Sequence, residues 1–286
     1  MTGVHFVYYK LGYSPAPVLP PPFEVELVLQ AVSWLELPTV LGSDVAGEVI
    51  AIGSETTSRF SEYLTVKTHL ASHPPSHVSH EQASVVPLAL ITASVGLFGK
   101  GYLELQHPSV KRKPTGKSLL FWGGATIGSC TIQVAVSAGY EVITTASPKN
   151  FDPTVQDDII SVLSAKASAG VLAIAGVDAE SRASVTNACL DVASEVDGVK
   201  FISMAMPAPD KLLDGINAKF IIAFDLKTDL ELGNAIFRDY LPNALASGKY
   251  TAAPPAEVLE EGLKALQEGL DILQKGVLVK KLVVTM

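Results

Sequence analysis

The sequence predicts an α/β protein that combines a doubly wound parallel sheet with a second, β-rich domain. The first observation is a β-α-β unit of about thirty residues around the stretch "FWGGATIGSC", the unit from which parallel sheets are built. The second is a change near residue 82 from strand-like alternation to helical spacing. The third is composition, since 48% of the 286 residues are hydrophobic and 17% are charged, which supplies a large core and argues against disorder.

The elements follow from the pattern in chain order. Strands are expected in "FEVELVLQAVS" (23–33), which alternates, and in "VLGSDVAGEVIAIGS" (40–54), whose glycines suit a bent, barrel-like sheet. A strand and turn are expected over 61–74, and a helix over 81–98. Because this apolar stretch is interrupted and shorter than the ~20 residues of a membrane span, we expect a buried helix. Further strands are expected at 117–124, 141–148, 170–176, 199–206, 218–224 and 279–286, and further helices at 125–140, 154–166, 180–192, 231–247 and 256–274.

Charge and cysteine content narrow the function classes. The formal net charge is -8 and the isoelectric point about 5.3, which argues against a nucleic-acid surface and against binding to anionic membranes. Two cysteines, Cys130 and Cys189, cannot form a disulfide framework or a four-thiolate zinc site, so we expect a cytoplasmic protein in a reducing compartment. The N-terminus has no basic region and no small-residue cleavage site, so no signal peptide is expected.

The glycine turn in "FWGGATIGSC" either holds a dinucleotide or only connects a strand tightly to a helix. Its spacing is Gly123-x-Ala125-x-x-Gly128, with a strand predicted before it and a helix after it. The N-terminus of a helix presents unpaired N–H groups and a partial positive charge to a diphosphate. Glycines let backbone and phosphate approach closely, and the last glycine lets the helix pack against the strand. This context favours dinucleotide binding over the purely structural alternative.

The end of the second strand distinguishes between the two nicotinamide cofactors. An NAD site usually places Asp or Glu there to accept hydrogen bonds from the ribose 2′-hydroxyl. This chain has "TTASPKN" instead, which offers Ser147 and Lys149. A hydroxyl and an ammonium suit a 2′-phosphate, so the sequence predicts NADPH rather than NADH. The alternative is that Lys149 is an ordinary solvated loop lysine.

Three motifs, in this order along the chain, resemble those of one protein family: "PTVLGSDVAGEVIAIGS", "FSEYLTVKTHLASHPPSHVSHEQASVVPLALITASVGLF" and "LLFWGGATIGSCTIQVAVSAGYEVITTASPKNFD". Together they look like the medium-chain dehydrogenase/reductase superfamily, and within it the zinc-independent branch of quinone-oxidoreductase-like proteins and fungal trans-acting enoyl reductases. The resemblance covers most of residues 24–286. It implies a GroES-like domain formed by 1–90 and 246–286 and a Rossmann NADP-binding domain formed by 91–245. The last strand, with Lys280 and Lys281, would return to the first domain.

The resemblance also bears on zinc. Zinc-dependent members carry a His-Glu pair at the step where this chain has Ser43 and Asp44, and a cysteine in the first domain, where this chain has none before Cys130. The histidines of "HLASHPPSHVSH" are interrupted by Pro74 and Pro75, which break a helix. We therefore favour a loop cluster over an adventitious metal site, and no metal site is predicted.

The chain departs from the family pattern at three places. It lacks an "N-P-x-D" type segment before "PTVLG", a "GDRV" strand and loop after "AIGS", and a helix with the third Rossmann strand after "SPKNFD". Either the protein is shortened at these places, or the sequence joins the ordered pieces of a longer protein. No proton donor is assigned for this reason, and Trp34, Asp44 and Tyr63 are not taken as catalytic.

Cofactor contacts are implied by the resemblance at several positions. They are Gly124, Ala125, Thr126, Ile127 and Gly128 at the pyrophosphate, Ser147 and Lys149 at the 2′-phosphate, and Thr92 at the nicotinamide end. The alternative for Thr92 is a hydroxyl bonded back to its own helix. Gly176, Met204 and Met206 end later strands, whose carboxyl ends face the cleft in such sheets. For the two methionines, core packing is the favoured alternative.

The activity implied by the resemblance is NADPH-dependent hydride transfer without zinc. The partner would be a small-molecule substrate, namely an enone, an enoyl thioester or a quinone, with no nucleic acid and no membrane. The alternatives are an NADPH-binding protein without turnover and a partner subunit of a polyketide synthase. We expect a monomer or a homodimer, in which "AKFIIAF" (218–224) is either buried or an exposed edge strand that pairs with a second copy.

Overall fold

The computed structural model describes residues 44–47, 66–123, 125–145, 159–175, 179–259, 265, 268–269, 271–272 and 280–285. The strand expected at 23–33, most of 40–54 and 61–65, and with them Trp34 and Tyr63, lie outside the described residues. The described end of the segment 61–74 forms a 3-10 helix, η1 (Thr68–Leu70), and not a strand. A tertiary contact accounts for this, since His69 is buried and its Nε2 atom lies 3.3 Å from the carbonyl oxygen of Leu226.

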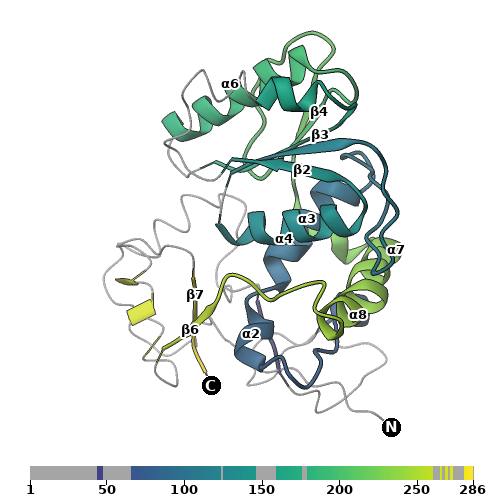
Figure 1. The fold of residues 1–286 in the computed structure, drawn as a ribbon. Coiled ribbons are helices and arrows are strands. Elements are labelled where there is room, and N and C mark those ends of the chain that lie inside the picture. Colours follow the sequence, from purple (N-terminus) through teal and green to yellow (C-terminus); the bar gives the residue numbers. More distant parts are fainter. Residues whose placement is uncertain are drawn as a thin grey trace.

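Five parallel strands form the central sheet in the order β2-β1-β3-β4-β5 (Figure 1). Their bounds are β1 (Ser118–Trp122), β2 (Glu141–Thr144), β3 (Ser168–Ala173), β4 (Phe201–Met204) and β5 (Asn217–Phe220). Each strand lies within or overlaps a predicted range, and the parallel pairing confirms the predicted α/β class. Strands β1 and β3 are central and buried throughout, which explains why their sequences are continuous apolar runs rather than alternating ones.

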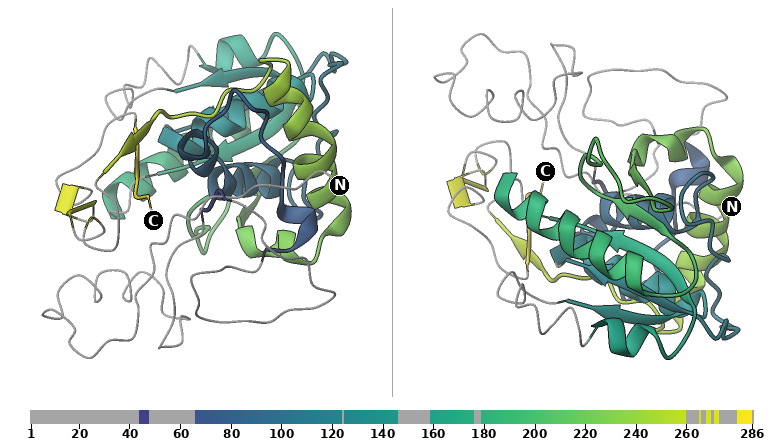
Figure 2. Two further views of the ribbon diagram at one scale, coloured as in Figure 1. Left: turned by 90° about the horizontal axis from the view of Figure 1, so that it is seen from below. Right: turned by 90° about the horizontal axis from the view of Figure 1, so that it is seen from above.

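Helices cover both faces of the sheet (Figures 1 and 2). Helices α3 (Pro87–Phe98) and α4 (Ala125–Ser137) pack on one face, and α6 (Ala179–Glu195) packs on the other. Side chains of β1 alternate between the two layers. Leu119 and Phe121 lie in the core cluster that includes α3 and α4, whereas Leu120 and Trp122 lie in the cluster that includes α6. The sheet is therefore doubly wound, as the sequence predicts.

The apolar stretch 81–98 forms two helices rather than one. Helix α2 (His80–Ser84) begins with a capping box made by Ser79 and Gln82, and α3 starts separately because Pro87 cannot continue α2. By length and composition alone, His80–Phe98 could cross a membrane, but 67% of its most apolar window is buried inside the protein. The stretch is therefore a core segment, which confirms the expected buried helix.

The C-terminal part differs from the prediction at one place. Helix α7 (Leu230–Gly233), a π-helix η4 (Asn234–Tyr240) and α8 (Leu241–Ala246) follow one another directly, which confirms the helix expected at 231–247. The predicted helix at 256–274 is wrong at its start, where β6 (Ala256–Val258) pairs in parallel with β7 (Lys281–Val283). Prolines at 254 and 255 disfavour a helix just before this segment, and pairing with the chain's end satisfies its backbone. Residues 265, 268–269 and 271–272 are helical.

The described sheet has β2 at one edge and β5 at the other. In the six-stranded dinucleotide fold, with order 3-2-1-4-5-6, a third strand lies outside the second. Among the described residues between β2 and β3, the only regular element is the helical segment 159–163. Its Ile159 and Leu163 pack in the core beside α6, so the described sheet ends at β2. At the other edge, Phe220 and Ile222 are 43% and 45% exposed, whereas Ile221 between them is 4% exposed and packs in the core, so the 218–224 segment is only partly buried. Pairing in a homodimer stays a prediction, as do the boundaries of the two domains.

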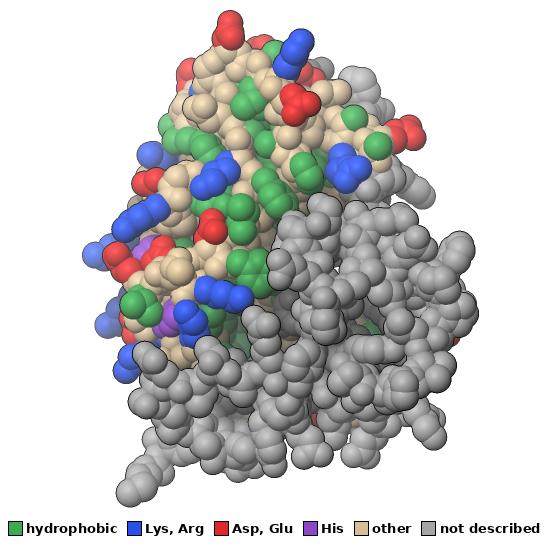
Figure 3. Space-filling model, turned by 180° about the vertical axis from the view of Figure 1, so that it is seen from behind, with side chains coloured by type: hydrophobic (Ala, Val, Ile, Leu, Met, Phe, Trp, Pro, Cys, Tyr) green, Lys and Arg blue, Asp and Glu red, His purple; other side chains and the backbone are tan. Residues whose placement is uncertain are grey.

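Acidic and basic side chains are interspersed on the described part of the surface. In the view from behind, Lys and Arg side chains lie among Asp and Glu side chains, with hydrophobic side chains between them (Figure 3). Although the net charge is -8, the described surface in this view is not uniformly acidic.

Candidate functional site

Strands β1 and β3 are neighbours whose following helices lie on opposite faces of the sheet, since α4 follows β1 and α6 follows β3. In open α/β sheets, ligands bind at such a switch point, outside the carboxyl ends of the strands. The backbones stay paired just beyond the strands, because the Ile174 N–H donates to the Trp122 carbonyl at 2.8 Å and the Thr145 N–H donates to the Phe121 carbonyl at 3.3 Å. The predicted nucleotide turn leaves the sheet at this point.

Gly123 is the residue with which the turn begins. Its φ of +133° is one that side chains rarely adopt, and an added Cβ would lie 2.7 Å from the carbonyl oxygen of Ile174. Its N–H donates to Oγ1 of Thr145 at 3.2 Å, which links the turn to the end of β2. Close approach of the β3 backbone therefore requires glycine here, whether or not a nucleotide is bound.

Gly128 brings helix α4 against strand β1. A Cβ at this position would lie 2.7 Å from Cε1 of Phe121, whose ring is fully buried. This is the packing role that the spacing of the turn predicts for its last glycine. Phe121 therefore fixes the depth at which the helix lies on the sheet, and so the place of its N-terminus beyond the carboxyl end of β1.

The N-terminal turn of α4 is the part of the site suited to an anion. The helix begins at Ala125, and its first turn contains no acidic residue. The first N–H groups of a helix have no partner within it, and its dipole favours negative charge there. Ile127 is half-buried and packs on the core, so it offers its backbone rather than its side chain. Gly124 and the side chains of Ala125 and Thr126 lie outside the described residues.

Other predicted contacts are only partly placed by the structure. Ser147, Lys149 and Gly176 lie outside the described residues, so their assignment stays a prediction. Met204 and Met206 are 0% and 4% exposed and pack in the core with α6, which confirms the packing alternative for both.

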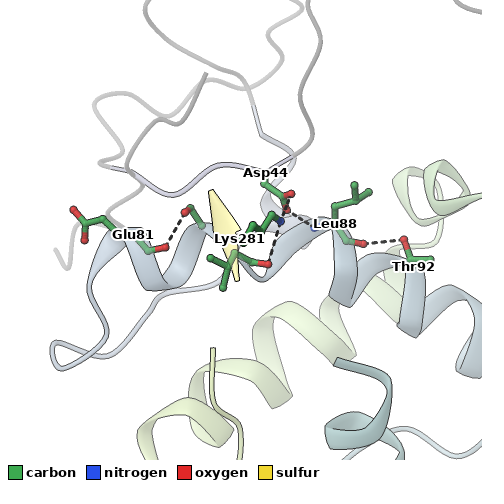
Figure 4. A network of polar contacts seen from close by, with 7 residues as sticks. Asp44, Glu81, Leu88, Thr92 and Lys281 are labelled. Carbon is green, nitrogen blue, oxygen red and sulfur yellow. Dashed lines mark hydrogen bonds and ion pairs between the residues drawn. The ribbon is translucent and has the colours of Figure 1, made fainter. Parts of the chain in front are cut away.

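Thr92 lies one turn into α3 and is 8% exposed. Its Oγ1 donates to the carbonyl of Leu88 at 2.9 Å, the back-bonded arrangement that the sequence left as an alternative (Figure 4). A hydroxyl has one proton, so toward a ligand this group can act only as an acceptor. A contact with the cofactor stays a prediction, restricted by this geometry to a donor such as an amide N–H.

Cys130 and Tyr250 form a buried pair that sequence reasoning did not identify. The Tyr250 hydroxyl donates to Sγ of Cys130 at 3.0 Å, between α4 and the segment after α8. Burial raises the pKa of the Cys130 thiol to about 11, while the hydrogen bond from Tyr250 acts in the opposite direction. The thiol is therefore neutral near pH 7 and is not an activated nucleophile. No local signal could reveal the pair, because the residues stand 120 positions apart.

A cavity of about 440 Å³ lies between the end of α3, η3 (Ala223–Lys227) and α7, and none of the described residues that line it belongs to the glycine turn. Tyr102 borders it and accepts a hydrogen bond from the Ile222 N–H at 3.1 Å. Burial raises the pKa of Tyr102, with the Asp225 carboxylate adding to the shift. Sequence reasoning did not identify Tyr102, because the segment around it has no periodic signal.

The described residues contain no group of three His, Cys, Asp or Glu side chains placed to hold a metal ion. Asp44, at the step where zinc-dependent proteins carry an acid, accepts from the Leu88 N–H at 2.6 Å and forms an ion pair with Lys281. Both of its oxygens are thus engaged within the chain.

The sheet order and the glycine turn together define an α/β fold of the dinucleotide-binding type, and comparisons with known proteins identify the family. No protein-family model matches the chain. The dehydrogenase orf1 of Aspergillus niger is 43% identical over 291 positions, which cover 88% of this chain and 84% of that protein. The trans-enoyl reductase himH of Aspergillus japonicus is 30% identical over 289 positions, 87% of this chain and 82% of the relative.

Solved structures agree on the fold. An alcohol dehydrogenase superfamily protein of Novosphingobium aromaticivorans matches with a TM-score of 0.67 at 18% identity. The match covers 99% of this chain and 91% of that protein. A mycobacterial protein solved in complex with NADPH has a TM-score of 0.61 at 19% identity, with the same coverage. Together with the sequence relatives, these likenesses show that the chain belongs to the medium-chain dehydrogenase/reductase superfamily.

The comparison with the Aspergillus niger dehydrogenase also bears on the missing segments. Since 88% of a 286-residue chain is fewer than 291 positions, the alignment contains positions that only the relative fills. The relative therefore has residues within the aligned region that have no counterpart in this sequence.

Proposed function

We propose that the chain is a zinc-independent, NADPH-dependent reductase that transfers hydride to an activated C=C bond or to a quinone. The observation that carries the proposal is the glycine turn at the switch point, where Gly123 and Gly128 allow the close packing that sets the first turn of α4 at the carboxyl end of β1. Two comparisons support it, since himH is a trans-enoyl reductase and the mycobacterial neighbour was solved with NADPH.

The chain's own residues would bind and orient the reactants. The N-terminus of α4 suits the diphosphate of the cofactor, and Ser147 and Lys149 suit its 2′-phosphate. Thr92 can accept a hydrogen bond from the nicotinamide amide. The cofactor supplies the hydride, and the chemistry then requires a hydrogen-bond donor for the enolate that forms and a proton for the α-carbon.

The surroundings of Asp44 support independence from zinc. A carboxylate that accepts from the Leu88 N–H and pairs with Lys281 is already satisfied by the chain, and a metal would have to compete with both partners. Dialysis against a chelator should therefore leave turnover unchanged. Loss of activity that added zinc restores would contradict this part of the proposal.

The direct test of the activity mixes the protein with NADPH and a panel of enones, enoyl thioesters and quinones, and follows the absorbance of the reduced cofactor. We expect turnover with at least one class. Thermal stabilisation by NADPH without any turnover would instead support a binding protein, because a ligand of the native state raises stability whether or not it reacts. The positions that only relatives fill are the observation that favours this second candidate.

Cofactor choice is tested by Ser147→Ala combined with Lys149→Ala. Loss of two phosphate ligands should weaken NADPH binding by about tenfold or more, roughly 1.4 kcal/mol, and leave NADH binding unchanged. Lys166→Ala is the matched control, because this lysine forms an exposed ion pair with Glu141 at the opposite, amino end of β2. Equal loss of both cofactors in the double variant would refute the phosphate assignment.

A further inference from the structure

We propose that Asp44 and Lys281 form a positioning pair that holds the first turn of helix α3, and through it Thr92, in place for the cofactor. The proposal rests on the proposed function. The two residues stand 237 positions apart and meet at the N-terminal end of α3 (Figure 4). Both belong to segments assigned by sequence to the GroES-like domain, so the pair joins that part of the chain to the helix that leads into the sheet.

Asp44 supplies a cap that α3 does not provide for itself. Val86, the residue before the helix, makes no side-chain cap, and Pro87 has no N–H. The first N–H that needs a partner is therefore that of Leu88. Oδ1 of Asp44 accepts from it at 2.6 Å, and the helix dipole favours a carboxylate at this end.

Lys281 balances the carboxylate and reaches a second helix. Its Nζ forms the ion pair with Oδ2 of Asp44 and also donates to the carbonyl of Val85 at 3.2 Å. Val85 follows directly on α2, so one ammonium from β7 closes the junction between α2 and α3. The side chains of Lys281 and Asp44 are only 25% and 19% exposed, so water screens this pair less than an ordinary surface pair.

Hydrogen bonds continue from the pair to Thr92. Leu88 binds Asp44 through its N–H and accepts from Thr92 Oγ1 through its carbonyl. Later in the helix, Ser203 Oγ of β4 donates to the carbonyl of Gly96 at 2.7 Å, which fixes that half of α3 on the sheet. Losing the pair should therefore loosen the beginning of α3, where Thr92 takes its orientation, and leave the end in place.

The test measures NADPH affinity by protein fluorescence, and stability by urea unfolding, in wild type and four variants. Asp44→Asn keeps an oxygen for the Leu88 N–H but loses the charge, whereas Asp44→Ala loses both, and Lys281→Met removes the ammonium. We expect Kd to rise about threefold in the first and about tenfold in the other two, tenfold being ~1.4 kcal/mol. Lys281→Arg should restore an affinity close to that of wild type.

Lys280→Met is the matched control, at the residue just before β7. Lys280 pairs with Glu257, and their side chains are 41% and 40% exposed, so this pair should contribute little and its loss should leave Kd within about twofold. A pair with a merely structural role would lower the urea midpoint of the Asp44 and Lys281 variants while leaving Kd unchanged under folded conditions. That result would overturn the proposal, and so would equal weakening in Lys280→Met.

A double-mutant cycle tests whether the pair acts through Thr92. Thr92→Val removes the hydroxyl and keeps the branched shape. If the pair works through this hydroxyl, Asp44→Asn should weaken NADPH binding less in the Thr92→Val background than in wild type. Equal fold-changes in the two backgrounds would contradict the proposed route.

Hydrogen exchange distinguishes failure of the pair from failure of the proposed function. Wild type that binds neither NADPH nor NADH would overturn the proposed function and the cofactor part of this proposal together. The structural part is decided separately by Asp44→Ala, in which we expect faster exchange at the backbone amides of Leu88–Thr92 and no change at Gly96. Unchanged exchange at Leu88–Thr92 would show that the pair does not hold the helix.

Discussion

Gly128 matters both for the packing of the core and for the position of the candidate nucleotide site. Because it has no Cβ, helix α4 can lie close against Phe121. An alanine there would bring Cβ to 2.7 Å from Cε1 of Phe121, in a core where that ring is fully buried. Overpacking of this kind costs about 1–3 kcal/mol, of which the better helix propensity of alanine returns less than about 1 kcal/mol. Gly128→Ala should therefore lower the free energy of unfolding in urea by roughly 1–2 kcal/mol.

Ser129→Ala is the control for that measurement. Ser129 is the next residue of α4, and its Oγ lies 3.5 Å from Nε2 of Gln133, a contact at the limit of a hydrogen bond. Its loss should change stability by less than about 0.5 kcal/mol. If Gly128→Ala were as stable as wild type, the ring of Phe121 would have room to move, and the glycine would not be needed for packing.

Single residues were predicted from sequence where the signal was local. The spacing of the turn predicted what Gly128 does, because the strand and the helix that it brings together are adjacent in the chain. The partner of Asp44 could not be predicted, since Lys281 lies 237 positions away and an isolated lysine carries no pairing signal. For Thr92 the sequence left two readings, and the structure shows the hydroxyl bonded to its own helix.

At the scale of elements, α6 shows how a distant side chain can end a helix. Its last turn contains no basic residue, but Lys200, at the start of the next strand segment, donates through Nζ to the carbonyls of Ala193 and Ser194 at 2.7 and 2.9 Å, and to that of Val196. A cation at this end also interacts favourably with the negative end of the helix dipole. Lys200→Met keeps the apolar part of the side chain and removes the ammonium. It should therefore lower the free energy of unfolding in urea by about 1–2 kcal/mol.

Lys211→Met provides the comparison for Lys200→Met, because it removes the same charge from an exposed position in the segment after β4. We expect a change within about 0.5 kcal/mol there. Equal effects of the two substitutions would show that net charge, and not the end of α6, determines the stability change.

Elements were predicted well where the hydrophobic period is unambiguous and flanking residues mark the ends. The unit β1-α4-β2 has both, with glycines after the first strand and after the helix. The strand β6 has neither, because Ala256–Val258 is three residues long and its pairing partner is the chain's last strand. Sequence periodicity there continued into a helical pattern, and tertiary pairing overrode it.

For the whole molecule, the order of the described strands determines where the candidate site lies. The order β2-β1-β3-β4-β5 places the switch point between β1 and β3, and the described sheet keeps this point intact although it ends at β2. The described residues therefore keep the switch point at which the proposed diphosphate site lies. The sequence lacks the motifs of the third strand, and its absence from the protein stays a prediction, whereas the switch point could be placed only once the order of the strands was known.

The central claim is that a nicotinamide dinucleotide binds with its diphosphate at the N-terminus of α4. Hydrogen exchange of the wild-type protein with and without saturating NADPH tests it most directly, because bound phosphate oxygens protect the amides they contact. We predict slower exchange at Gly123 and over residues 125–128. Protection only around the cavity beside Tyr102 and Leu226, or no protection anywhere, would contradict the assignment.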